Sequence, residues 1–158
     1  DFRTNLGARK DLSKNVVIYG HSMDDNPDGA RFSQLKKYLD IEYCKQNPYI
    51  YFSTPEADLT WQIFAVYYTD ISFDYIEPNP DSAKFTNMLS EMKQRSQFIF
   101  DVDVSASDTI LTLSTCTYKE TTNRSNYRYV VQAKLLPAGA SLTTPVKVEV
   151  NPSPKSPF

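Results

Sequence analysis

The chain alternates short runs of β-branched and aromatic residues with groups of turn-forming residues, and this alternation limits the fold it can adopt. The runs lie at 15–19, 49–53, 59–70, 98–104, 109–116, 127–136 and 146–150. Runs of this composition, bounded by Gly, Pro, Asn and Asp, predict strands. Many strands at short spacing, with few helices between them, favour a closed or sandwich-like antiparallel sheet over a doubly wound one. The predicted fold class is therefore mostly β.

Two segments carry a helical period instead. Residues 30–40 place Phe32, Leu35 and Leu39 on one face of a modest amphipathic helix. The second segment has apolar residues at positions 85, 88, 89 and 92, and it follows the turn signal Pro80-Asp81-Ser82. We therefore expect one longer helix at about 81–96, inserted between strands.

Length and charge exclude several classes of partner. The chain has 158 residues, of which 41% are hydrophobic, so one domain with a real core is expected. It carries 17 basic and 19 acidic residues, a net charge of −2, without a dense basic block. Nucleic acid is therefore not expected as a partner. The longest apolar run, 63–68, is far shorter than the roughly 20 residues of a membrane-spanning helix. Because the chain starts at Asp1 without an initiator Met, we expect that an upstream segment has been removed.

The two cysteines, Cys44 and Cys116, allow one disulfide at most and exclude a disulfide scaffold. A zinc site needs more Cys and His ligands at close spacing than two scattered cysteines and one histidine provide. The acidic residues also lack the spacing of a calcium-binding loop. We therefore expect no metal and no cofactor. Cys44, near the end of a predicted helix, is interpreted as a small packing residue.

Cys116 stands at the end of a predicted strand, on its more polar face. Because side chains alternate along a strand, Ser114 shares that face with Cys116. A loop follows, and Arg128 opens the next predicted strand. If the two strands form a hairpin, Arg128 lies beside Cys116. A neighbouring cation stabilises the thiolate form of a cysteine, which is the nucleophilic form.

A reactive thiol also needs a group that transfers protons, and His21, at the end of the strand 15–19, is the one histidine in the chain. Each of these residues has an ordinary structural interpretation as well. A cysteine at a strand end is often a buried apolar residue, a lone histidine often lies in a loop, and an arginine often covers apolar surface with its stem. Composition and periodicity leave both interpretations open.

Three motifs resemble the sortase family. The sequence TLSTC at 112–116 is similar to the TLxTC motif around the sortase nucleophile, VVIYGH at 16–21 to the strand with the sortase histidine, and RYVV at 128–131 to the strand that begins with the sortase arginine. Their order along the chain also matches. The expected helix at 81–96, with DFRTNL at 1–6 and YGHSM at 19–23, is most like class B sortases.

The resemblance implies a closed eight-stranded β-barrel with short helices and one longer inserted helix. It covers about residues 1–136, which we expect to form the catalytic domain. Residues 137–158 show no family feature, and their proline-rich end, NPSPKSPF, has no apolar period. We expect this C-terminal extension to be partly extended, and the sequence leaves open whether it is attached to the domain.

The resemblance also assigns roles to residues. It implies that Cys116 forms a thioester with a sorting-motif peptide, that His21 transfers protons and that Arg128 holds the substrate and its oxyanion. Arg124, in the preceding loop, is a second candidate arginine, but Arg128 opens its strand as the family arginine does. The resemblance adds Ser114, with Tyr75 and Ile76 in the loop before the long helix, as substrate-binding residues. Ordinary packing is the alternative for these three.

The implied activity is a cysteine transpeptidase that joins surface proteins to a peptidoglycan cross-bridge amine. Alternatives are a pilin polymerase with a lysine acceptor, a cysteine protease with water as acceptor, and a binding module without turnover. The expected location is the outer face of a Gram-positive cell membrane, with the membrane anchor in a segment before Asp1. The expected active form is a monomer.

Overall fold

The computed structural model describes residues 1–23, 25–118 and 126–157. The strands are β1 Asn15–Gly20, β2 Tyr49–Tyr51, β3 Thr60–Asp70, β4 Phe98–Phe100, β5 Ile110–Cys116, β6 Tyr127–Leu135 and β7 Val148–Val150. The helices are α1 Ile41–Gln46 and α2 Ser82–Arg95, with two 3₁₀ helices, η1 Arg9–Asp11 and η2 Phe32–Leu39. In these described ranges no helix has both the length and the apolar character needed to cross a bilayer.

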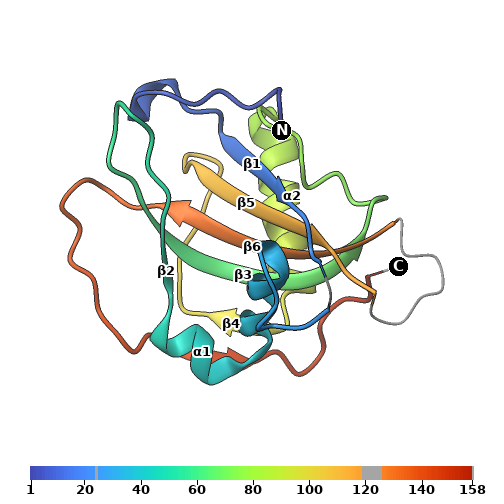
Figure 1. Cartoon of the computed structure of the whole chain (residues 1–158). Helices are drawn as coiled ribbons and strands as arrows, with labels where there is room; N and C mark the ends of the chain where they lie inside the picture. Colours follow the sequence, from blue (N-terminus) through green and yellow to red (C-terminus); the bar gives the residue numbers. More distant parts are fainter. Residues whose placement is uncertain (24, 119–125, 158) are drawn as a thin grey trace.

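Five strands form one curled sheet in the order β1-β5-β6-β3-β2 (Figure 1). Strand β1 pairs with β5 in parallel, and the other pairs in this sheet are antiparallel. Strands β4 and β7 form a separate two-stranded ribbon. The mostly β prediction is confirmed. The expected closure into eight strands differs in detail, because β1 and β2 are edge strands of the five-stranded sheet and β4 pairs outside it.

Both faces of the sheet are buried, and the longest strand supplies residues to each. Trp61, Ile63, Val66 and Tyr68 of β3 belong to one apolar cluster, whereas Phe64, Ala65 and Tyr67 belong to the other. The register shifts between residues 63 and 65, which is the mark of a β-bulge and explains the local break in alternation. The run at 63–68 is continuously apolar for this reason, since neither face meets water there.

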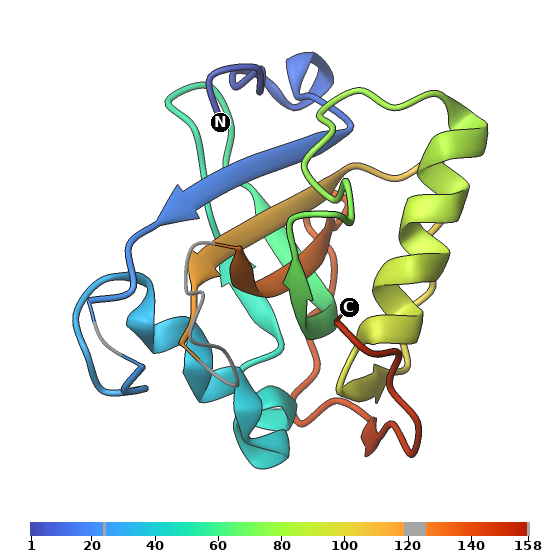
Figure 2. The same ribbon diagram turned by 90° about the vertical axis from the view of Figure 1, so that its right-hand side faces the viewer.

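Helix α2 lies along one face of the sheet (Figure 2). It begins after Asp81, whose carboxylate accepts a hydrogen bond from the backbone N–H of Lys84 at 2.8 Å and so caps the helix. Its buried face consists of residues at helical spacing, namely Phe85, Met88, Leu89 and Met92. The expected helix at 81–96 is confirmed with bounds Ser82–Arg95.

The first expected helix is a 3₁₀ helix, and its buried face differs from the expected one. Its buried residues are Ser33, Lys36 and Tyr38, whereas Leu39 is 37% exposed. A 3₁₀ helix has three residues per turn, so positions 33 and 36 share a face. Of the expected face, Leu35 is partly buried against the core, whereas Leu39 lies four residues further on and so falls outside a three-residue repeat from it.

The C-terminal segment is attached to the rest of the fold. Strand β7 pairs with β4, and the guanidinium of Arg95, at the end of α2, donates to the backbone oxygens of Ser156 and Pro157, each at 3.2 Å. Lys155 forms an ion pair with Glu91 on the same helix at 2.6 Å. These contacts hold the proline-rich end against the lower end of α2 (Figure 2).

Candidate active site

The register of the sheet brings Cys116 and Arg128 together. Strand β5 ends at Cys116, strand β6 starts one residue before Arg128, and these two residues are directly paired in the antiparallel ladder. Directly opposed residues have their Cβ atoms within about 5.5 Å of each other. The hairpin predicted from the sequence is confirmed. Arg124, the second candidate, lies outside the described residues.

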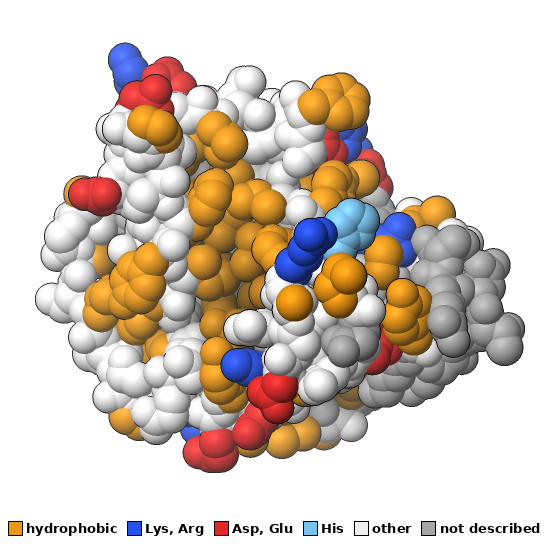
Figure 3. Space-filling view, in the orientation of Figure 1, with side chains coloured by type: hydrophobic (Ala, Val, Ile, Leu, Met, Phe, Trp, Pro, Cys, Tyr) orange, Lys and Arg blue, Asp and Glu red, His pale blue; other side chains and the backbone are white. Residues whose placement is uncertain are grey.

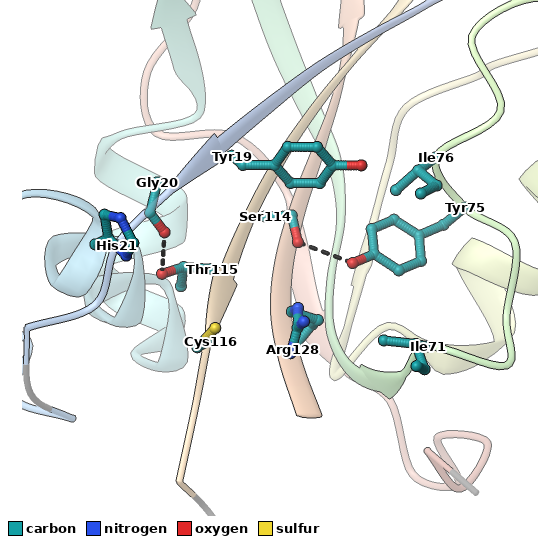
Figure 4. Close-up of a pocket in the computed structure, with 10 residues that line it drawn as sticks. All are labelled: Tyr19, Gly20, His21, Ile71, Tyr75, Ile76, Ser114, Thr115, Cys116 and Arg128. Atoms are coloured by element: carbon teal, nitrogen blue, oxygen red, sulfur yellow. Dashed lines mark hydrogen bonds between the residues drawn. The ribbon is translucent and has the colours of Figure 1, made fainter. Parts of the chain in front are cut away.

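His21 reaches the same edge of the sheet from the other side of Cys116. Strand β1 runs parallel to β5, with Gly20 opposite Thr115, so the segments that follow the two strands leave the sheet at the same end. The hydroxyl of Thr115 donates to the Gly20 carbonyl at 2.7 Å and joins the two strand ends. In Figure 4, Cys116 lies between His21 and Arg128, as the order β1-β5-β6 requires.

Glycine is needed just before the histidine. A Cβ atom on residue 20 would lie 2.1 Å from Cγ of Phe32, so any larger residue would push that ring aside. The backbone N–H of Phe32 donates to the carbonyl of His21 at 3.1 Å. The His21 side chain itself is exposed, and it is the pale blue group at the surface in Figure 3. The backbone at this turn is therefore fixed while the imidazole stays accessible.

One pocket of about 400 Å³ contains all six residues that the sequence analysis proposed for the site. They are His21, Cys116, Arg128, Ser114, Tyr75 and Ile76, and the remaining lining residues are Tyr19, Gly20, Ile71 and Thr115 (Figure 4). Tyr19, Gly20 and Thr115 lie inside the quoted motifs, next to or near His21 and Cys116, and their position in those motifs is the signal that could have found them. Ile71 follows β3 and carries no sequence signal.

Tyr75 and Ser114 are hydrogen bonded to each other inside the pocket. Their hydroxyl oxygens are 2.9 Å apart, and either can be the donor. Tyr75 is only 3% exposed, and burial raises its pKa above the usual value, so it remains a neutral phenol. This pair places a neutral polar group on the pocket face of β5, two residues before Cys116.

The two cysteines have different surroundings. Cys44 is completely buried, and its thiol donates to the carbonyl of Tyr38 at 3.3 Å. Burial raises the pKa of Cys44 to about 12. Cys116 is partly exposed and lines the pocket. Of the two, Cys116 is the thiol that a substrate can reach.

An ion pair between a buried lysine and a partly exposed aspartate joins the segments that follow His21 and Cys116. The Lys36 side chain is 2% exposed and pairs with Asp25, and its ammonium also donates to the Ser22 hydroxyl at 2.7 Å. The other carboxylate oxygen of Asp25 accepts from the backbone N–H of Tyr118 at 2.7 Å. These contacts connect the turn after β1, helix η2 and the first residues after β5. In the part of the chain described, no three His, Cys, Asp or Glu side chains are grouped as a metal site requires.

Comparisons with known proteins agree with this geometry. The sequence model of the Sortase domain matches residues 6–136. Sortase B of Listeria monocytogenes is 36% identical over 136 residues, which cover 85% of this chain and 53% of that relative. Sortase B of Staphylococcus aureus is 34% identical over 139 residues, covering 86% of this chain and 53% of that relative. The structure of a Staphylococcus aureus sortase B–substrate complex is similar with a TM-score of 0.74 at 30% identity, over 87% of this chain and 61% of that one.

The chain thus spans about half the length of the curated relatives that it matches. The family match nevertheless covers most of the chain and includes every residue that lines the pocket. The chain belongs to the sortase family, and the relatives that it matches are class B sortases.

Proposed function

We propose that this domain is a cysteine transpeptidase that cleaves a C-terminal sorting motif through a thioester on Cys116 and passes the acyl group to a cell-wall amine. The observation that carries the proposal is the joint placement of Cys116, His21 and Arg128 on three adjacent strand ends around one pocket. Cys116 lines this pocket, whereas the other cysteine, Cys44, is fully buried in the core.

In the first half of the reaction, the Cys116 thiolate attacks the carbonyl carbon of the scissile bond, and the carbonyl oxygen becomes an oxyanion. Arg128, directly opposite Cys116 in the ladder, supplies the positive charge that stabilises this oxyanion. As the carbon–nitrogen bond breaks, the protonated His21 gives its proton to the leaving amine. The products are an acyl thioester on Cys116 and a neutral His21.

In the second half, an acceptor amine attacks the thioester carbonyl, and neutral His21 takes the proton that the amine loses. The carbon–sulfur bond then breaks, which restores the thiolate and leaves a new amide bond. Ser114, Tyr75 and Ile76 line the wall of the pocket and are assigned to peptide binding. The donor peptide belongs to a secreted surface protein, the proposed acceptor is a peptidoglycan cross-bridge amine, and the proposed location is the outer surface of a Gram-positive cell.

The test is intact-protein mass spectrometry with a panel of sorting-type peptides, with and without triglycine as the acceptor amine. We expect an acyl adduct on Cys116 and a product that depends on the amine. Hydrolysis that ignores the amine would indicate a protease instead, and a lysine-dependent product would indicate a pilin polymerase. The absence of any adduct, together with unchanged peptide affinity in Cys116→Ala, would refute the enzymatic proposal.

Two further variants test the assigned roles. His21→Ala should abolish turnover, because it removes the proton carrier for both half-reactions. Arg128→Ala should lower kcat much more than Arg124→Ala does. The reverse order would assign the oxyanion role to Arg124.

A further inference from the structure

Four polar side chains form a hydrogen-bonded row across the sheet. They are Asn15 of β1, Thr112 of β5, Gln132 of β6 and Tyr67 of β3, and each is fully buried. Thr112 is paired with Gln132 in the ladder. Because side chains alternate along strands, Thr112 and Gln132 face the same side as Ile110 and Val130, which belong to the cluster packed under α2. A polar row inside an apolar layer is costly to bury unless its members satisfy one another.

One end of the row holds the loop that forms the pocket wall. The amide nitrogen of Asn15 donates to the backbone oxygens of Tyr75 at 2.9 Å and of Glu77 at 3.1 Å. These two carbonyls flank Ile76, and both Tyr75 and Ile76 line the pocket. The backbone N–H of Asn15 also donates to the carbonyl of Pro78 at 2.9 Å. A single residue on β1 therefore makes three hydrogen bonds to a loop that has no ladder of its own.

Counting hydrogens gives the row a direction. Both N–H groups of Asn15 are used by the loop carbonyls, so its oxygen must accept, and the Thr112 oxygen lies 2.6 Å from it. The single hydrogen of the Thr112 hydroxyl is therefore committed to Asn15. Gln132 Oε1 is placed 2.8 Å from the Thr112 oxygen, and Gln132 Nε2 is 3.0 Å from the Tyr67 oxygen. Two acceptors cannot share one hydrogen, so the hydrogen count favours the Gln132 amide turned by 180°, donating to Thr112 and accepting from Tyr67.

With that orientation the four side chains form one directed series of hydrogen bonds. Tyr67 donates to Gln132, Gln132 to Thr112, Thr112 to Asn15, and Asn15 to the two loop carbonyls. Burial raises the pKa of Tyr67, so the phenol keeps the hydrogen that starts the sequence. The row begins on β3, next to the edge strand β2, and ends at the pocket wall.

We infer that Asn15, Thr112, Gln132 and Tyr67 are positioning residues that fix the Tyr75–Ile76 wall of the pocket and so determine how tightly the donor peptide binds. This inference rests on the proposed function for its catalytic consequence. None of the four residues lines the pocket. Their effect should therefore appear in KM for the peptide and not in the chemistry at Cys116, which belongs to the end of β5.

Thr112 gives the sharpest test, because it sits in the middle of the row and has two nearly isosteric replacements. Thr112→Val removes the hydroxyl and leaves Asn15 and Gln132 without their shared partner, whereas Thr112→Ser keeps it. The matched control is Ser96→Ala. Ser96 is also a buried hydroxyl that bonds backbone groups, those of Val66 and Phe98, but it follows the far end of α2.

The first readout is hydrogen–deuterium exchange of the segment 71–80, which does not require activity. Exchange should become about tenfold faster in Thr112→Val and stay near the wild-type rate in Thr112→Ser and Ser96→Ala. The second readout is steady-state kinetics with a sorting-type peptide. KM should rise about fivefold to tenfold in Thr112→Val, with kcat and the rate of Cys116 modification by a small thiol reagent within twofold of wild type.

The possible outcomes separate the two proposals. If the wild-type protein forms no adduct with any peptide, the proposed function fails, and the exchange experiment still decides whether the row fixes the loop. If the wild-type protein turns over but Thr112→Val shows unchanged exchange and KM, the positioning inference is overturned. A fall in kcat and thiol reactivity at constant KM would also overturn it, because the row would then act on Cys116.

Discussion

At pH 8 Cys44 should react at least a thousandfold more slowly than a free thiol, so Cys116 should be the one rapidly modified cysteine, and this tests the identity of the nucleophile. An ordinary thiol of pKa 9.0 is about one-tenth thiolate at pH 8, whereas the Cys44 thiol, with its pKa raised to about 12 by burial, is thiolate in about one molecule in ten thousand. The ratio of these fractions is about 1,000. Complete burial slows Cys44 further, because a reagent can reach it only after local opening.

The assay is modification with an aromatic disulfide reagent at pH 8, followed by absorbance and intact mass. One equivalent should react rapidly in the folded protein, and this equivalent should disappear in Cys116→Ala. A second equivalent should appear only when urea unfolds the chain. Cys44→Ala should retain the fast equivalent, which makes it the matched control. Two rapid equivalents in the folded wild type, or a rapid equivalent in Cys116→Ala, would refute this reasoning.

Three predictions concern stability. Tyr67→Phe should lower the free energy of unfolding by about 2 kcal/mol, since it leaves one end of the buried Gln132 amide without its partner. Tyr129→Phe should change it by less than about 0.5 kcal/mol or raise it, since no described residue bonds the buried Tyr129 hydroxyl. Equal losses in urea unfolding would contradict this. Lys36→Met should lower the free energy of unfolding by about 2 kcal/mol. This is less than the roughly 3–5 kcal/mol typical of a fully buried pair, because Asp25 is 31% exposed. A change below about 0.5 kcal/mol in thermal unfolding would show that the pair contributes nothing. Burial raises the pKa values of Cys44 and Tyr129, so above about pH 9 the unfolded chain loses protons that the folded chain keeps. The free energy of unfolding should therefore fall as the pH rises. Urea titrations at pH 8 and 10.5 check this, and a higher free energy of unfolding at pH 10.5 would contradict it.

Much of the fold follows from local patterns in the sequence. The strand expected at 15–19 and the helix expected at 81–96 appear with bounds within one residue, because each has a strong period and clear capping or turn residues. The pairing of Cys116 with Arg128 followed from hairpin geometry alone. The strand expected at 98–104 stops at Phe100, since pairing with β7 covers only three residues.

Features that depend on distant contacts could not be predicted. The segment 32–39 is a 3₁₀ helix whose buried Lys36 pairs with Asp25, a contact between separate segments that the local apolar pattern does not contain. Ile71 enters the pocket because of where β3 ends, and no motif marks that point. The buried row from Tyr67 to Asn15 joins four strands, so its members have no common spacing in the sequence.

The boundary of family similarity is not the boundary of the folding unit. The family match ends at residue 136, yet the carbonyls that receive the Arg95 guanidinium belong to Ser156 and Pro157. A protein shortened to the family match would keep the whole pocket. It would, however, expose the Arg95 side chain, which is now 8% exposed, and it would leave β4 without its partner strand β7. Fusion partners and affinity tags are therefore better joined after residue 157 than at the edge of the family match, since residues 155–157 hold the C-terminal segment on the last turns of α2.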